Sequence, residues 1–92
     1  MIFPVLHLNG TSREGLMDPI RDACGAVQEA IGALEDAAPN ARDYYPLGPD
    51  AFETARREHG DRVRRLREVR DELIVIHQHL YEVPRRPGEV QR

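Results

Sequence analysis

Seam residues recur at alternating steps of three and four along two long stretches of this sequence, which is the spacing of a coiled-coil seam. The first stretch comprises Met17, Ile20, Cys24, Val27, Ile31, Leu34 and Ala38, and the second comprises Phe52, Ala55, His59, Arg62, Leu66, Val69, Leu73, Ile76, Leu80 and Val83. A chain of 92 residues holds one small domain. We therefore predict an all-α fold, an antiparallel two-helix hairpin at residues 1–84, followed by a disordered tail at 85–92.

Capping signals and prolines set the expected bounds of the first helix. The signals are, in chain order, the capping-box pair Thr11 and Glu14, the N-cap and proline pair Asp18 and Pro19, and the terminating Pro39. We expect a loose turn over residues 12–17 and a helix over about 19–38. The sequence leaves open whether the two segments join.

The second helix and the N-terminal segment are read from the same kinds of signal. Asp50 and Glu53 fit a further capping box, so a long helix is expected to follow the loop at 39–49 and to run to about Glu82. The segment "IFPVLHL" is rich in aliphatic residues, but Pro4 cannot donate a ladder hydrogen bond. This segment is therefore expected to be a short edge strand or an extended arm.

A row of small residues follows the same rhythm one position before the first seam. Its members are Ala23, Ala26, Ala30, Ala33 and Ala37. One partner helix covers the seam, whereas the small residues let a second backbone approach closely. In a two-helix chain that second cover must come from another subunit, so we expect a homo-oligomer formed through the first helix.

Charge and composition exclude several classes of partner. The net charge is −3, and residues 53–72 hold seven arginines against six acidic residues, so duplex nucleic acid is not an expected partner. All 13 basic residues are arginine, which fits either a GC-rich genome or bidentate recognition of phosphate. With one cysteine, Cys24, and no stretch long enough to span a membrane, we expect a cytoplasmic protein with no internal disulfide.

Two adjacent tyrosines, Tyr44 and Tyr45, lie in the loop beside Arg42 and Asp43. A single tyrosine would most simply cover the end of the hydrophobic seam. Two adjacent side chains project in different directions, so one can pack while the other remains available. An exposed tyrosine near an arginine is a suitable platform for a nucleobase, because the ring stacks on the base while the guanidinium binds phosphate.

The second seam becomes polar near the loop, at His59 and Arg62. A charged residue at a seam position is unfavourable unless it is paired or faces a cavity. In one interpretation the packing shifts to Val63 and Arg62 stays in solvent. In the other, His59 and Arg62 line a polar pocket beneath the tyrosines, with Arg56 nearby as a further phosphate contact.

The turn "HLNGTS" is a second candidate anion site. It contains His7, Asn9, Gly10, Thr11 and Ser12. Successive backbone N–H groups at the start of a helical segment can bind an anion, although an ordinary N-cap explains the same letters. At 1.5 Å per residue the first helix is roughly 30 Å long, so the turn and the loop belong to opposite ends of the hairpin. A site that uses both must therefore lie between subunits packed head to tail.

Catalysis and metal binding have little support in the sequence. There is no nucleophile elbow, Walker loop or His-Glu-x-x-His motif. His77 and His79 are two positions apart on a helix and face different sides. We therefore expect a protein that is not an enzyme, with no cofactor and no metal site.

Taken together, "HLNGTS", "RDYYP" and the "EH" of Glu58 and His59 resemble a widespread family of short phage and prophage proteins. The matching residues are His7, Leu8, Asn9, Gly10 and Thr11 in the turn, Arg42, Asp43, Tyr44, Tyr45 and Pro46 in the loop, and Glu58 and His59 in the helix. The match covers about residues 6–82, and Ala41 stands where other members often have glycine. Small helical phage proteins of this kind include sponges that sequester cyclic nucleotide immune signals.

The resemblance therefore implies a non-enzymatic protein that sequesters a cyclic dinucleotide, a cyclic trinucleotide or a cyclic ADP-ribose isomer in the host cytoplasm during phage infection. The expected ligand-binding residues are His7, Asn9, Gly10, Thr11, Ser12, Arg42, Asp43, Tyr44, Tyr45, Arg56, His59 and Arg62. The alternative is a protein-interaction module, such as an anti-CRISPR-like inhibitor or a phage accessory protein. It would dock through the alanine row and the RDYYP loop.

Overall fold

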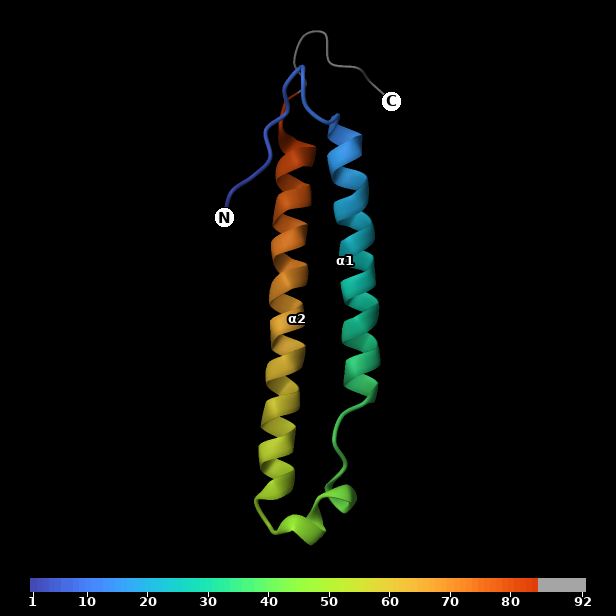
Figure 1. Cartoon of the computed structure of the whole chain (residues 1–92), viewed down its shortest axis with the longest axis vertical. Helices are drawn as coiled ribbons and strands as arrows, with labels where there is room; N and C mark the ends of the chain where they lie inside the picture. The colour runs from blue at the N-terminus through green and yellow to red at the C-terminus, as the bar shows by residue number, and fades with distance from the viewer. Residues whose placement is uncertain (85–92) are drawn as a thin grey trace.

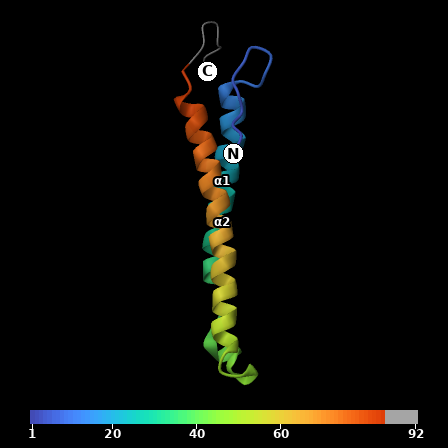
Figure 2. The same cartoon turned by 90° about the vertical axis from the view of Figure 1, so that its left-hand side faces the viewer.

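The computed structural model describes residues 1–84 and forms a long helical hairpin (Figure 1). Helix α1 spans Arg13–Asp36, helix α2 spans Ala51–Glu82, and residues 1–84 contain no strand. Two short 3₁₀ turns, η1 over Ala41–Asp43 and η2 over Tyr45–Leu47, connect the helices. The molecule measures 67 × 22 × 18 Å, and its thinness is clear in the turned view (Figure 2). The predicted all-α antiparallel hairpin is confirmed, while the predicted tail at 85–92 lies outside the described residues.

Helix α1 begins earlier than predicted. Ser12 is the N-cap, rather than Thr11 or Asp18, and its hydroxyl accepts a hydrogen bond from the Gly15 N–H at 3.1 Å. The helix continues through Pro19, so the two segments left open by the sequence join, and the expected loose turn over residues 12–17 is wrong because it is helical from Arg13. A proline inside a helix removes one backbone hydrogen bond. The packing of the first turns of α1 against α2 outweighs that local loss, because tertiary packing supplies most helical stability in proteins.

The predicted seam of α1 faces α2 along most of its length. Its buried or half-buried members are Met17, Ile20, Cys24, Val27, Ile31 and Leu34. Ile31 is 1% exposed and is the best-buried residue of this helix. The helix ends at Asp36, two residues before the expected end, so Ala38 lies outside it and is exposed.

The seam of α2 departs from the strict alternation at two positions, where Val63 replaces Arg62 and Arg70 replaces Val69. Val63 is 6% exposed and occupies the core position, whereas Arg62 is exposed. The interpretation in which packing moves to Val63 is therefore correct. Further along, Val69 is 46% exposed and Arg70 is half-buried in its place. An α-helix drifts relative to a strict heptad, and a one-residue shift keeps the Arg62 guanidinium in water.

The start of α2 lies where it was predicted, but the capping box does not form. Asp50 has helical backbone angles (φ −95°, ψ −10°), and its side chain makes no capping hydrogen bond. An N-cap side chain normally needs extended backbone geometry to reach the first turn. The Glu53 carboxylate instead accepts hydrogen bonds from Arg56.

The chain before α1 is an extended arm, not a strand, and it lies along the outer side of the last turns of α2 (Figure 1). The Phe3 ring stacks on His79 with centroids 4.4 Å apart, and Leu6 is 6% exposed. Arg13 is buried, and its Nη1 donates to the carbonyl oxygen of Leu80, which is itself 0% exposed. We call this end of the hairpin the closed end, and the opposite end, formed by residues 40–52, the loop end.

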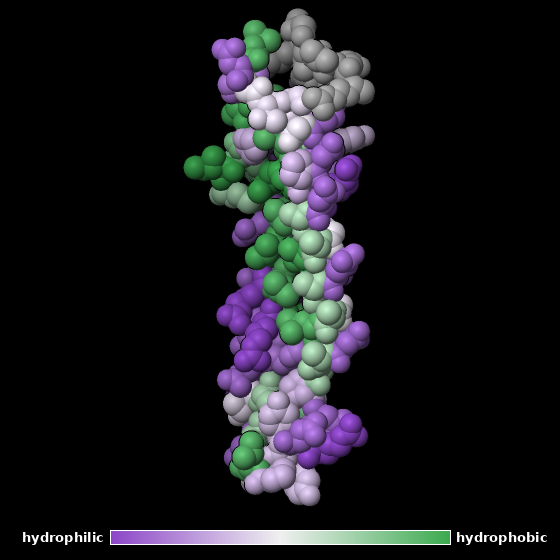
Figure 3. Space-filling model, turned by 45° about the vertical axis from the view of Figure 1, so that its right-hand side comes forward, coloured by the Kyte–Doolittle hydropathy of each residue, from purple (hydrophilic) through white to green (hydrophobic). Residues whose placement is uncertain are grey.

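The hydrophobic core is thin for a chain of this length. Within residues 1–84 the buried hydrophobic side chains are Leu6, Ile31, Val63 and Leu80. All five members of the alanine row are exposed, four of them on α1 and Ala37 at its C-cap. Figure 3 shows a band of hydrophobic and weakly hydrophobic residues running along the hairpin. A single chain therefore leaves much of its apolar surface uncovered.

Candidate functional site

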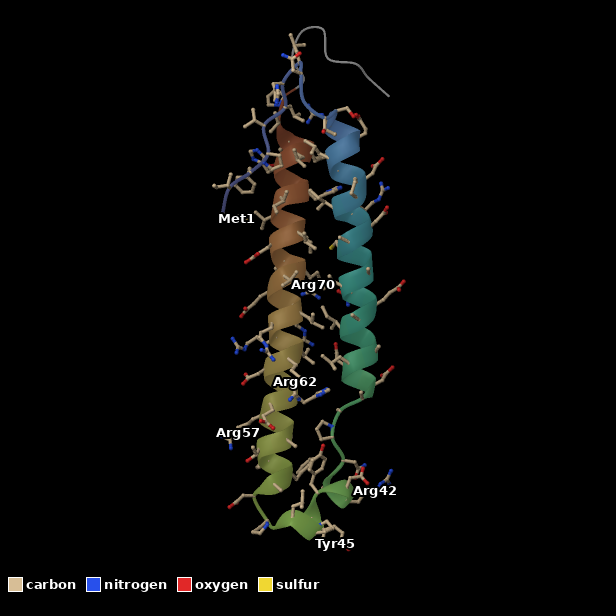
Figure 4. All side chains as sticks on the ribbon, viewed as in Figure 1. Met1, Arg42, Tyr45, Arg57, Arg62 and Arg70 are labelled. Carbon is tan, nitrogen blue, oxygen red and sulfur yellow. The ribbon has the colours of Figure 1, made fainter. Side chains whose placement is uncertain are left out.

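The two loop tyrosines have different environments. Tyr44 is half-buried, and its ring lies 6.4 Å from that of Phe52 at an interplanar angle of 49°. Tyr45 is 74% exposed and lies at the tip of the molecule (Figure 4). The turn into α2 needs Gly48, whose φ of +110° is a conformation that other residues rarely adopt. One tyrosine thus packs on the start of α2 while the other remains available to a ligand.

Arg42 lies on the same loop, and its backbone is held in place. The Asn40 side-chain oxygen accepts a hydrogen bond from the Arg42 N–H at 3.1 Å and caps η1. The Arg42 guanidinium points away from the helices (Figure 4) and makes no ion pair within residues 1–84. Asp43, the next residue, is also exposed. The loop end therefore presents an aromatic face and a free guanidinium together.

Arg56 is exposed but already engaged. Its Nε lies 3.2 Å from both carboxylate oxygens of Glu53. These hydrogen bonds lower the pKa of Glu53, and the same carboxylate raises the pKa of Arg56. A phosphate would have to compete with Glu53 for this guanidinium.

His59 and Arg62 do not lie beneath the tyrosines. His59 is half-buried, and its Nε2 is buried without a hydrogen-bond partner in the described part of the chain. Arg62 lines a shallow hollow of about 250 Å³ on the outside of α2, with Glu58, Asp61, Arg64 and Arg65. It lies about three helical turns beyond the first residue of α2. A pocket roofed by the loop over both residues is therefore not formed in this arrangement.

The "HLNGTS" turn lies at the closed end. The Gly10 N–H donates to the His7 carbonyl oxygen at 3.1 Å, and a Cβ at Gly10 would lie only 2.6 Å from His7 Nε2. Asn9 and Thr11 are exposed, whereas the Ser12 hydroxyl caps α1. The turn is thus shaped by the close approach of His7 to Gly10, and its exposed polar groups face solvent.

The twelve predicted site residues fall into separate groups. Arg42, Asp43, Tyr44 and Tyr45 lie together at the loop end, and His7 to Ser12 lie together at the closed end. Within one chain the length of α1 separates the two groups, as predicted. The remaining three, Arg56, His59 and Arg62, are spread along the first half of α2.

Sequence reasoning missed one residue of the loop end. Leu47 is 75% exposed and belongs with Tyr45 to the 3₁₀ turn η2. The sequence contains a signal for this exposure, because Leu47 lies in a short connection. An aliphatic residue there has no apolar neighbour across the hairpin and little to pack against. The exposed tip is thus more apolar than the tyrosine alone indicates.

No family model, no curated protein and no solved structure matches the chain. Neither helix within residues 1–84 is long and apolar enough to cross a membrane. The same residues include no cluster of three or more histidine, cysteine or acidic side chains able to hold a metal ion.

Proposed function

We propose that this protein is a non-enzymatic, homo-oligomeric binding protein that captures a small nucleotide-type anion at sites shared between subunits. The observation that carries the proposal is that a 74% exposed Tyr45 lies on the same loop as an Arg42 side chain that has no ion pair within residues 1–84. The ring offers a stacking face for a base, worth roughly 1–3 kcal/mol, and the guanidinium offers hydrogen bonds to phosphate.

The shape of the hairpin supports a site between subunits. The second group of polar residues, at the "HLNGTS" turn, is separated from the loop by the length of α1. Head-to-tail packing of two copies would bring the loop of one to the turn of the other. The alanine row is exposed, and the thin core leaves other apolar side chains uncovered. Packing between subunits would cover both.

The biological role follows from the sequence resemblance described above. A phage protein that sequesters a cyclic nucleotide in the host cytoplasm needs affinity and abundance, and it needs no catalytic group. Under this proposal the protein removes an immune signal from the bacterial effectors that detect it.

Calorimetry against cyclic dinucleotides, cyclic trinucleotides and cyclic ADP-ribose isomers tests the proposal. At least one ligand is expected to bind, and Tyr45→Ala should weaken it by roughly 5- to 150-fold, as loss of one stacked base implies. Arg42→Ala should also weaken binding. The matched control is Arg57→Ala, an exposed arginine of α2 away from both the loop and the turn, which should bind as the wild type does. Absence of binding across the whole panel would refute the proposal.

The shared site has its own test in the assembly state. Light scattering should show an oligomer at micromolar concentration, and Ala30→Glu, which places a charge in the exposed alanine row, should reduce the mass. A wild-type protein that is monomeric under these conditions would remove the case for sites between subunits.

The exposed loop tip also favours a second candidate function, a protein-interaction module. Tyr45 and Leu47 are 74% and 75% exposed, and tyrosine is one of the residue types enriched among the anchors of protein interfaces. Such a module should ignore nucleotides and retain a phage or host protein that Leu47→Asp no longer retains. Nucleotide binding that is sensitive to Tyr45→Ala but unaffected by Leu47→Asp would decide against this candidate.

A further inference from the structure

A groove between α1 and α2 lies away from the RDYYP loop and the HLNGTS turn. It has a volume of about 380 Å³, within the range of roughly 300–1,000 Å³ typical of small-molecule sites. Gly25 of α1 and Leu73 and Ile74 of α2 form its apolar part. Figure 4 shows Arg70, another lining residue, between the two helices.

The groove is open because of two residues that flank the seams. Gly25 follows the seam residue Cys24, and a Cβ built on it would meet nothing within 4 Å. Ile74 follows Leu73 and remains 47% exposed, although it is a large aliphatic residue. An apolar side chain that is half exposed inside a concave surface gains from contact with an apolar ligand.

Arginine and glutamine side chains, together with His77, form the polar boundary. Arg70 donates to the Gln28 side-chain oxygen at 2.8 Å and to Asp71 at 3.0 Å, so this wall is fixed across both helices. Arg21 also lines the groove, and within residues 1–84 it is held only by contacts of 3.6 Å to Asp18 and 3.9 Å to Asp22. Guanidinium groups donate hydrogen bonds and accept none. A ligand group that binds the Arg21 guanidinium must therefore carry acceptor atoms.

We propose that this groove binds a small molecule with a compact apolar body, aromatic or branched aliphatic, and one carboxylate or sulfonate group. The apolar body lies against Gly25, Leu73 and Ile74. The acidic group is directed toward Arg21, whose exposed carboxylate contacts are long enough for a ligand acid to replace. This site is separate from the loop and does not depend on the proposed nucleotide binding.

Anilinonaphthalene sulfonate has the required chemistry, since it joins an aromatic body to a sulfonate. The wild-type protein is expected to bind it with saturable enhancement of its fluorescence. Gly25→Leu fills the groove and should weaken binding roughly 10- to 200-fold, the effect of misfit by a methylene group or more in an apolar pocket. Because no atom opposes a Cβ at this position, the variant should keep its helical circular dichroism.

The matched control is Gly32→Leu. Gly32 lies seven residues further along the same side of α1, also has nothing within 4 Å of a Cβ, and does not line the groove. This variant should bind the dye as the wild type does. Absence of saturable binding, equal binding by Gly25→Leu, or equal loss in both variants would overturn the groove as the site.

The role of the acidic group is tested by removing the charge of Arg21 in one experiment and the charge of the dye in another. Arg21→Gln should weaken the sulfonate dye by roughly two- to fivefold, as expected for a solvent-exposed ion pair. The same variant should leave binding of neutral N-phenylnaphthylamine unchanged. Equal effects on the two dyes would overturn the role assigned to Arg21.

Discussion

At the closed end the arm and both helices are joined by almost fully buried side chains, whereas at the loop end the contacts are fewer and more exposed. Leu6, Arg13 and Leu80 are each at most 6% exposed, and a buried hydrogen bond links the last two. At the loop end the main ring contact is between Tyr44 and Phe52, both half-buried.

The closed end therefore contributes mainly to the stability of the fold, whereas the loop end leaves side chains exposed and available for binding. Contacts at the closed end remove apolar groups from water and tie the first turn of α1 to the last turns of α2. The loop end keeps its backbone ordered with local bonds such as that between Asn40 and Arg42, and leaves Tyr45 free. Substitutions at the closed end should therefore act on folding, and those at the loop tip on binding.

The largest effect is expected at Leu80. Leu80→Ala removes a side chain that is 0% exposed and should lower the free energy of unfolding by about 2–5 kcal/mol, as buried leucines do. Chemical denaturation measures the change. The control is Leu47→Ala at the loop tip, which should stay within about 0.5 kcal/mol of the wild type. Equal losses of unfolding free energy at the two leucines would show that the two ends contribute equally to stability.

The two tyrosines sharpen the comparison within the loop end. Tyr44→Ala should lower the free energy of unfolding by about 1–2 kcal/mol, because the ring packs against Phe52. Tyr45→Ala should change it by less than about 0.5 kcal/mol, since its ring is largely in solvent. Thermal unfolding of both variants, measured side by side, gives the answer. If Tyr45→Ala loses more stability than Tyr44→Ala, the Tyr45 ring must make a contact that is absent from the single chain.

The two helix starts provide a smaller contrast. Ser12→Ala should lower the free energy of unfolding by about 1 kcal/mol, because the hydroxyl caps the Gly15 N–H. Asp50→Ala should have an effect of only a few tenths of a kcal/mol, because its side chain makes no capping bond. Urea titration of the two variants measures both changes in the free energy of unfolding. A loss at Asp50 equal to that at Ser12 would contradict the observed capping.

The smallest effect is the pH dependence of the Glu53–Arg56 pair at the loop end. The pKa of Glu53 is lowered from 4.5 in the folded protein, so the pair stabilises the fold above pH 4.5 and loses this contribution as the pH falls through the lowered pKa. The difference in melting temperature between wild type and Glu53→Gln should therefore shrink on going from about pH 6 to about pH 3. A difference that grows in acid would contradict this sign.

The regular seam explains why the hairpin and most of α1 could be predicted. Residues from Ile20 to Leu34 alternate by three and four with no charged member, so a single face satisfies every position. In α2 the strict alternation places Arg62 in the core, and Val63 lies one position away. The cost of removing a guanidinium from water decides between them, and that comparison depends on how far the two helices rotate against each other.

The caps and the candidate site were less predictable for a related reason. Thr11, Ser12 and Asp18 are all acceptable N-cap residues, and the choice of Ser12 depends on where the arm and α2 allow α1 to begin. Similarly, the letters "YY" predict one packed and one free ring but do not say which. The groove could not be predicted at all, because it arises from the relative position of Gly25 and Ile74 on two helices.

The contact between Arg13 and Leu80 joins residues 67 positions apart in the chain. During synthesis on the ribosome, the arm and the first turn of α1 are therefore complete long before their partners in α2 exist. The closed end can form only after Leu80 has been added, whereas Tyr44 and Phe52 are made within eight residues of each other. The arm must remain undocked while nearly the whole of the described chain is translated.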